Sequence, residues 1–202
     1  GNNYWAEQGI PIVAHVDAAA ELEEYGGSIL EGMKRSNRDK AEGTVLQLPT
    51  VTFENEYIVE MGPYRIEARY LGSAHSPGDI VVWLPNQSLV ISGDVAFHER
   101  MLPIFEHTYT ADWIETWDTA FEPLEATYVI PGHGHPTNMA QVRRYTKDYL
   151  VYLRDQIGAH LEDGGDLADA YYVDQSPEAH LDTFEELAAK TAGRVYEQME
   201  FE

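Results

Sequence analysis

The chain has 202 residues, which is enough for one well-packed α/β domain and short for two. A hydrophobic share of 44% argues against a disordered chain, and the absence of cysteine excludes disulfides and thiolate metal sites. The formal net charge of -22 repels phosphate backbones, so we expect no nucleic-acid partner. No apolar run approaches the roughly 20 residues of a membrane-spanning helix, so we expect no membrane partner.

The N-terminal part of the sequence predicts a short helix, a strand and a longer helix. Residues 4–9 are typical of a helix end, and the apolar residues 10–14 of a strand. The next helix is predicted over residues 17–25, with Asp17 as its N-cap residue and Gly26 and Gly27 as its stop.

From residue 51 onwards the pattern favours strands. Residues 64–71 alternate between apolar and polar side chains, as a half-buried strand does, and the turn at Gly62 joins them to the preceding strand as a hairpin. The other strands are predicted at residues 52–53, 57–60, 79–84, 88–92 and 127–130.

Helices dominate the C-terminal part of the sequence. A helix is predicted over 111–121, with Trp113 and Trp117 on one face, and a long amphipathic helix over 138–161. Residues 182–185 have the form of a capping box that opens the last helix. Because no repeat or linker interrupts the chain, we predict a single α/β domain over residues 1–202, with a helical extension from about residue 138.

Three glycine-containing turns, each directly after a predicted strand, carry the residues with metal-binding chemistry. His75 lies in the turn 72–79, Asp94 follows Gly93, and His133 follows Gly132. Imidazole nitrogen and carboxylate oxygen are ligands that zinc accepts, and glycine lets the backbone approach a ligand closely. Each turn is weak evidence by itself, whereas the ordered set indicates a metal site.

The ordered set resembles the later motifs of the metallo-β-lactamase superfamily. In that family a Thr/Ser-x-His-(Ser/Thr)-x-Gly-(Asp/Ser) turn follows a strand, and residues 73–79 match it. Gly93-Asp94 matches the Gly-Asp that ends an apolar strand, and residues 131–134 match the Pro-Gly-His-Gly turn. The resemblance covers roughly residues 1–140 and implies the layered α/β fold of that family, an αββα sandwich.

The family's His-x-His-x-Asp-His motif does not occur in these residues, and residues 1–15 resemble the segment that directly follows it. We therefore expect the first strands of the sandwich to be missing. The chain is then an inactive or incomplete fragment that binds zinc weakly or not at all, because three ligands drawn from two sites make a poor site. Bare strand edges favour pairing of the chain with a second copy of itself.

By resemblance, the intact protein holds two zinc ions and hydrolyses a small-molecule substrate. The resemblance implies that His75 completes one site, that Asp94 bridges the metals and orients a hydroxide, and that His133 completes the other site. The hydroxide then attacks an amide, ester or thioester carbonyl. Asp79 is expected beside the metals, where it fixes the turn around His75. His98 is a candidate for the substrate cleft or for the surface, and His135 is a candidate for a position beside the metals or for a turn residue.

The remaining histidines and two other functions complete the predictions. His15 is expected to have a structural role. Five apolar side chains are candidates for a rim over the site, although core packing is the default for such residues: Tyr4, Trp5, Met101, Leu102 and Phe105. The surface histidines are expected to be His107, His160 and His180. One alternative function is a non-catalytic module that keeps the scaffold without the metal site, and another is an iron-dependent redox relative. The compartment, cytoplasm or periplasm, stays open.

Overall fold

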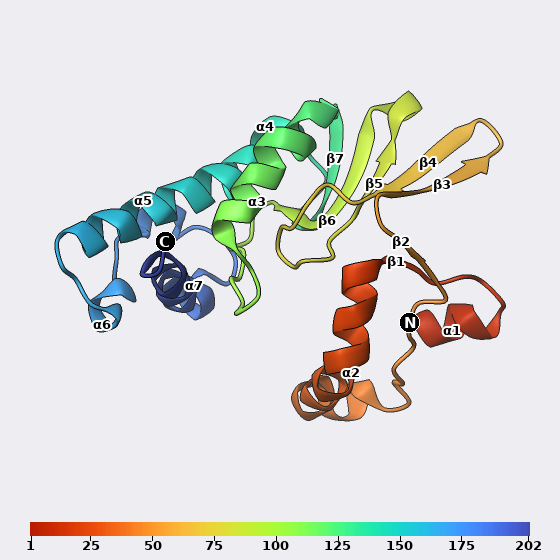
Figure 1. Cartoon of the computed structure of the whole chain (residues 1–202), viewed down its shortest axis with the longest axis horizontal. Coiled ribbons are helices and arrows are strands. Elements are labelled where there is room, and N and C mark those ends of the chain that lie inside the picture. Colours follow the sequence, from red (N-terminus) through yellow and green to blue (C-terminus); the bar gives the residue numbers. More distant parts are fainter.

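The computed structural model describes residues 1–202 and contains one sheet of five strands and another of two (Figure 1). The larger sheet has the order β3-β4-β5-β6-β7, so each strand lies beside the next one in the chain. The pairs from β3 to β6 are antiparallel, whereas β6 and β7 run parallel. Its strands are β3 (Glu56–Met61), β4 (Tyr64–Arg69), β5 (Val81–Leu84), β6 (Leu89–Phe97) and β7 (Tyr128–His133).

Helices pack beside β6 and β7 and share one core with the sheet. Helix α4 packs on both strands, and α5 packs on α3 and α7, as the grouping in Figure 1 shows. The core is a cluster of buried side chains that runs from Ala74 to Tyr196 and includes Trp113 and Trp117, which confirms the predicted face of their helix. These helices are α3 (Thr110–Thr116), α4 (Met139–Arg143), α5 (Tyr149–Glu162), α6 (Leu167–Ala170) and α7 (Phe184–Met199). None of the helices has the length and hydropathy that crossing a bilayer requires.

The N-terminal segment forms the smaller sheet and the helices next to it. It consists of α1 (Asn2–Glu7), β1 (Val13–His15), α2 (Val16–Asn37) and β2 (Val51–Phe53), with β1 and β2 paired in parallel. His15 is buried and is the N-cap residue of α2, because its Nδ1 accepts a hydrogen bond from the Asp17 backbone N–H at 3.2 Å. Its Nε2 donates to the Glu54 carbonyl at 2.9 Å, and its ring stacks on Tyr70.

The structural role predicted for His15 is therefore confirmed, whereas Asp17 as N-cap residue is wrong. The predicted end of this helix is also wrong, because α2 continues through Gly26 and Gly27 to Asn37. Gly26 is buried, and a Cβ there would lie only 2.9 Å from the Leu46 side chain. The glycine thus serves a close packing contact within the helix instead of ending it.

The capping box predicted at residues 182–185 does not form. Thr183, the N-cap residue of α7, has a φ of 64°, and its hydroxyl donates to the Asp182 carbonyl at 2.6 Å instead of accepting from the helix. The reason is tertiary: the Asp182 backbone pairs with the loop after β6, accepting from Met101 N–H and donating to the Glu99 carbonyl.

The strand β3 lies at an open edge of the larger sheet, since its only partner is β4. Ile58, Val59 and Met61 on this strand are exposed. At the opposite edge, the β7 residue Val129 exchanges backbone hydrogen bonds with Thr137. Pairing of β3 with a second copy of the chain stays a prediction.

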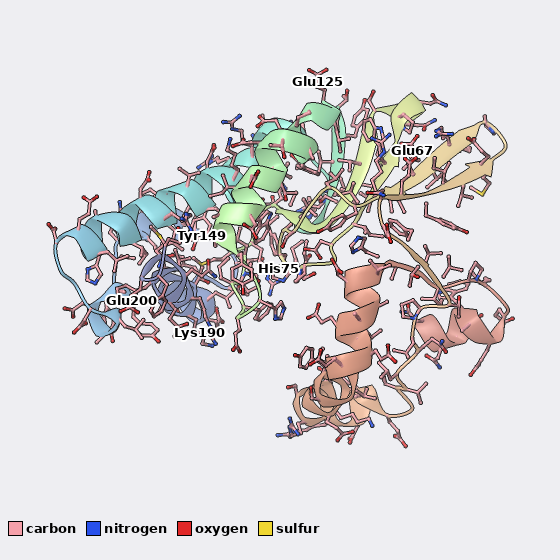
Figure 2. The ribbon with its side chains drawn as sticks, viewed as in Figure 1. Glu67, His75, Glu125, Tyr149, Lys190 and Glu200 are labelled. Atoms are coloured by element: carbon pink, nitrogen blue, oxygen red, sulfur yellow. The ribbon has the colours of Figure 1, made fainter.

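A carboxylate buried on β4 gives the sheet an acid-sensitive ion pair. The Glu67 side chain, labelled on the larger sheet in Figure 2, is 4% exposed. It is paired with the guanidinium groups of Arg65 and Arg69. Burial acts to raise the pKa of Glu67, but hydrogen bonds and charge from the two arginines outweigh it and hold the pKa below 4.5. The ion pair therefore stabilises the fold fully above pH 4.5 and is lost as the pH falls through the lowered value.

We expect Glu67→Gln to lower the free energy of unfolding at pH 7 by about 2 kcal/mol, because Arg69 then loses its charged partner and Arg65 keeps only its pair with Glu60. In urea titrations followed by circular dichroism, the difference from the parent protein should shrink as the pH falls below 4.5. Glu56→Gln on the exposed edge strand is the control and should change little. A difference that is the same at pH 3 and pH 7 would contradict the assignment of the effect to the ion pair.

Candidate metal centre

The parallel pair β6 and β7 brings Asp94 and His133 to the same region of the sheet. Asp94 lies within β6 and His133 ends β7. The register between the two strands shifts on both sides of Gly93, which has a φ of 52°. Such irregularities re-aim side chains at the edges of functional sites, and here one stands directly before Asp94.

The Asp94 carboxylate lies between two imidazole rings. One oxygen, Oδ2, is 3.8 Å from Nε2 of His75, and the other, Oδ1, is 3.6 Å from Nε2 of His133. Exposed fractions of 12%, 33% and 39% for the His75, Asp94 and His133 side chains make the group reachable from solvent. The structure thus brings all three predicted ligands together.

His75 is held in an aromatic surround. Its ring centroid lies 5.8 Å from Phe97, 5.2 Å from Phe105 and 5.7 Å from Trp113. Its backbone carbonyl accepts a hydrogen bond of 2.6 Å from the Thr108 hydroxyl. Burial lowers the pKa of His75 below 6.5, although the Asp79 and Asp94 carboxylates act in the opposite direction. The ring is therefore neutral at pH 7, which is the form that binds a metal ion.

Glycine is required at two positions of the Pro-Gly-His-Gly turn. A Cβ on Gly132 would overlap Oδ1 of Asp94 and would lie 2.7 Å from the Gly93 carbonyl carbon. Gly134 has a φ of 87°, and a Cβ there would overlap the His98 carbonyl oxygen. The turn therefore gives the Asp94 carboxylate the space in which it lies.

The spacing around Asp94 fits metal ligands in pairs. Two atoms that are each about 2.1 Å from one tetrahedral zinc ion lie roughly 3.4 Å apart, close to the observed 3.6 and 3.8 Å. The buried Nδ1 of His75 has no hydrogen-bond partner, and Nε2 is the nitrogen that faces Asp94. No group of three or more His, Asp or Glu side chains converges closely enough to hold one ion. The possible ligands therefore form two pairs, His75 with Asp94 and His133 with Asp94.

Arg100 is the site residue that the sequence did not reveal. Its Nη1 lies 2.9 Å from both ring nitrogens of His133, so the guanidinium covers the edge of that ring. A guanidinium carries a permanent positive charge, so it must move away before His133 binds a metal ion. The charged triplet His98-Glu99-Arg100 is visible in the sequence, but only the course of the loop after β6 shows which side chain points to His133.

The three residues expected beside the ligands hold turns in place. Asp79 accepts hydrogen bonds from the backbone N–H and the hydroxyl of Ser76, both at 2.7 Å, and so closes the turn that carries His75. His98 donates through Nδ1 to the carbonyl of His135 at 3.0 Å. The His135 ring is 85% exposed and pairs with Glu99, which raises the pKa of His135. Their functional roles stay predictions.

The predicted apolar rim is only partly present. Phe105 is half-exposed and its ring contacts His75, as a rim residue does. Met101 and Leu102 are instead fully buried core residues, because backbone pairing with Asp182 draws their loop inwards. For Met101 and Leu102 the default expectation of core packing is therefore the one that holds. Tyr4 and Trp5 contact each other on α1 and are exposed.

The fold and the site define a class of protein: an α/β sheet in which β6, β7 and an adjoining loop bring histidine and carboxylate side chains close together. The family model described as "Metallo-beta-lactamase superfamily" matches residues 1–133, a span that includes His75, Asp94 and His133. The chain therefore belongs to the metallo-β-lactamase superfamily.

Individual relatives agree with this family. A curated protein, "Metallo-beta-lactamase type 2" of Bacteroides fragilis, is 28% identical over 99 residues, which are 48% of this chain and 40% of that protein. The solved structure "Metallo-beta-lactamase from Pontibacter korlensis" superposes with a TM-score of 0.59 at 19% identity, over 75% of this chain and 62% of that chain. The solved structure of the DIM-1 metallo-β-lactamase exposed to ceftazidime superposes with a TM-score of 0.52 at 21% identity, over 74% of this chain and 60% of that chain.

The structural likenesses show the shared metallo-β-lactamase fold, as the sequence predicted. The chain spans less than two thirds of the length of each of these relatives. Residues 134–202, which include α4 to α7, lie outside the family match.

Proposed function

We propose that this chain contributes the His75, Asp94 and His133 ligands to a zinc-dependent hydrolase that cleaves an amide, ester or thioester of a small molecule. The observation that carries the proposal is the Asp94 carboxylate, with one oxygen facing each histidine at 3.8 and 3.6 Å. When bound, zinc supplies the Lewis acidity that acidifies a water molecule and polarises a carbonyl group. His75, Asp94 and His133 would hold it.

The chain's own residues position that chemistry. Asp94 has one oxygen facing each histidine, so it would be the ligand common to both sides of the site and would orient a water molecule that bound zinc acidifies. Asp79 fixes the turn of His75 through its two bonds to Ser76. The aromatic rings of Phe97, Phe105 and Trp113 keep water away from the His75 ring and favour its neutral form.

Zinc binding by the chain tests the metal part of the proposal. Because the ligands form pairs rather than a set of four, we expect weak binding of at most about one zinc ion per chain. Asp94→Ala should weaken the affinity by about tenfold or more, since the shared carboxylate is lost. Isothermal titration calorimetry measures the zinc affinity and the number of ions bound per chain, and absorption spectra of the cobalt-loaded chain provide an independent measurement. Asp112→Ala removes an exposed carboxylate and should leave the affinity and the number of ions unchanged.

A stoichiometry close to two ions per chain would overturn the expectation of an incomplete site, and equal affinity in Asp94→Ala would overturn the role of Asp94. Substrate class is tested on the zinc-loaded protein with a chromogenic β-lactam, a thioester and a lactone. Zinc-stimulated hydrolysis of any of them should fall at least about a hundredfold in Asp94→Ala.

One observation favours a non-catalytic module as the second candidate. The Arg100 guanidinium supplies a positive charge at His133, where a metal ion would otherwise supply it. If Arg100→Ala binds zinc as weakly as the parent chain does and no hydrolysis is found, the non-catalytic module is the preferred function. Tighter binding of ferrous iron than of zinc would instead favour a redox relative.

A further inference from the structure

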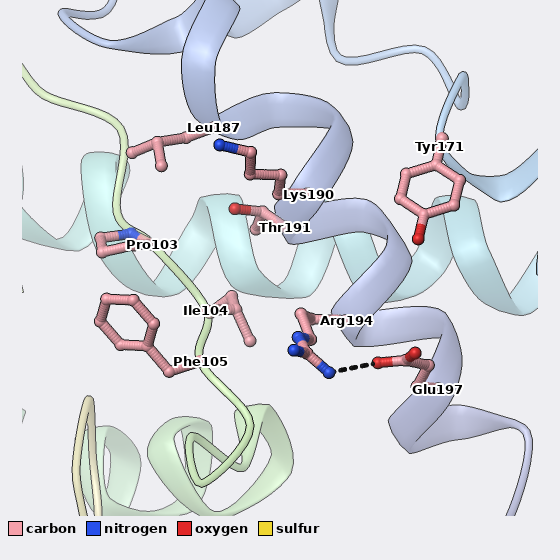
Figure 3. A pocket seen from close by; sticks show the side chains of 9 residues that line it. All are labelled: Pro103, Ile104, Phe105, Tyr171, Leu187, Lys190, Thr191, Arg194 and Glu197. Atoms are coloured by element: carbon pink, nitrogen blue, oxygen red, sulfur yellow. Dashed lines mark hydrogen bonds and ion pairs between the residues drawn. The ribbon is translucent and has the colours of Figure 1, made fainter. Parts of the chain in front are cut away.

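A pocket of about 340 Å³, separate from the candidate metal centre, lies between α7 and the loop after β6 (Figure 3). Its volume is at the lower end of the range for small-molecule sites. Pro103, Ile104 and Leu187 give it apolar walls. Phe105 lines the pocket and also contacts the His75 ring, so this side chain stands between the pocket and the metal centre. The α7 side of the pocket lies outside the family match.

The polar side of the pocket is basic, although the chain carries 35 acidic and 13 basic residues. Lys190 and Arg194 are four residues apart on α7, so both lie on the same face of the helix, where like charges repel each other. Arg194 is paired with Glu197 at 2.8 Å, whereas Lys190 has no carboxylate within 4.0 Å. One positive charge at the pocket is therefore left without a partner.

A buried hydroxyl beside Lys190 also lacks a partner. Thr191 is 1% exposed, and its Oγ1 makes no hydrogen bond within the protein. In Figure 3 the Thr191 hydroxyl and the Lys190 ammonium point to the same side, toward the segment that carries Pro103. A buried hydroxyl without a partner is costly, and a threonine in a helix ordinarily bonds a carbonyl of the preceding turn.

We propose that this pocket binds a small organic carboxylate. The Lys190 ammonium and the Thr191 hydroxyl both donate to the carboxylate, which satisfies the unpaired charge and the unpaired hydroxyl together. The apolar body of the acid lies against Pro103, Ile104 and Leu187. A carboxylate with a short apolar chain fits better than inorganic phosphate, because the site offers one ammonium and one hydroxyl beside apolar walls. The inference is independent of the proposed hydrolase function.

The test is a titration of the metal-free, ¹⁵N-labelled chain with butyrate at low ionic strength, followed by amide chemical shifts. We expect saturable shifts confined to residues 103–105 and 187–194. Lys190→Gln should weaken the affinity roughly tenfold, as the loss of one charge-assisted hydrogen bond implies, and Thr191→Val about fivefold. Lys40→Gln is the matched control, because Lys40 is also exposed and has no carboxylate within 4.0 Å.

Two other probes complete the test. Butyramide, which has nearly the same shape without the charge, should bind at least about tenfold more weakly than butyrate. Inorganic phosphate should also bind more weakly. Shifts elsewhere in the chain, equal binding of butyramide or of phosphate, or an unchanged affinity in Lys190→Gln would overturn the proposal. Because no metal is present, these results do not depend on zinc binding at Asp94.

Discussion

Replacing Trp113 with alanine is expected to lower the free energy of unfolding by about 4 kcal/mol. The Trp113 side chain is fully buried, and its indole Nε1 donates a hydrogen bond of 3.0 Å to the Val95 carbonyl. Its ring lies 6.2 Å from Phe97 and 5.7 Å from His75, measured between ring centroids. Alanine would leave a cavity next to β6 and an unpaired carbonyl close to Asp94.

Urea unfolding followed by far-UV circular dichroism measures the free energy of unfolding of Trp113→Ala and of the parent protein. Trp113→Phe separates the two causes of the loss, because it keeps most of the packing and loses only the hydrogen bond, at a cost of about 1–2 kcal/mol. Trp5→Ala is the matched control: Trp5 is 51% exposed, so its removal should cost less than about 0.5 kcal/mol. Equal effects of Trp113→Ala and Trp5→Ala would show that α3 does not pack on the sheet as described.

Gly132→Ala is expected to have the second large effect, on stability and on metal binding together. The new methyl group would overlap Oδ1 of Asp94 and lie 2.7 and 2.8 Å from the carbonyl carbon and oxygen of Gly93. Either the carboxylate or the backbone of β7 must move. We expect a loss of about 3 kcal/mol in the free energy of unfolding, as for other overpacked positions. Zinc affinity should fall as far as in Asp94→Ala.

The control for Gly132→Ala is Gly27→Ala. Gly27 lies within α2, and a Cβ there meets no atom within 4 Å, so alanine should stabilise the helix by about 0.5–1 kcal/mol. Zinc titrations are made at a temperature where both variants are folded. Parent-like stability in Gly132→Ala would show that β6 and β7 do not approach as closely as described. If Gly132→Ala lowers the stability but leaves the zinc affinity unchanged, the close packing of β6 and β7 is supported and the role of Asp94 as a ligand is rejected.

Local patterns were sufficient to predict most strands of the larger sheet. The period-two alternation near Glu67 and the turn at Gly62 predicted the β3–β4 hairpin, which the structure confirms in an antiparallel register. These patterns succeed because strand alternation and turn residues depend on neighbours in the sequence. The spacing of Trp113 and Trp117 predicted their buried face for the same reason.

Predictions failed where distant segments decide the conformation. Gly26 does not end α2, because its small size allows contact with Leu46, twenty residues further along the chain. Thr183 does not form a capping box, because the Asp182 backbone pairs with the loop after β6. The same pairing buries Met101 and Leu102, for which the sequence left a rim and the core as alternatives.

The sequence by itself determined the identity of His75, Asp94 and His133 as the ligand candidates, and through their motifs the family. Residue type and position after a strand are local properties, and they are sufficient for that step. Only the tertiary structure decided the distances between these three side chains, because the parallel pairing of β6 and β7 and the packing of His75 join segments far apart in the chain. Tertiary structure also placed Arg100 on His133 and brought Lys190 and Thr191 to face Pro103, contacts that no local pattern encodes.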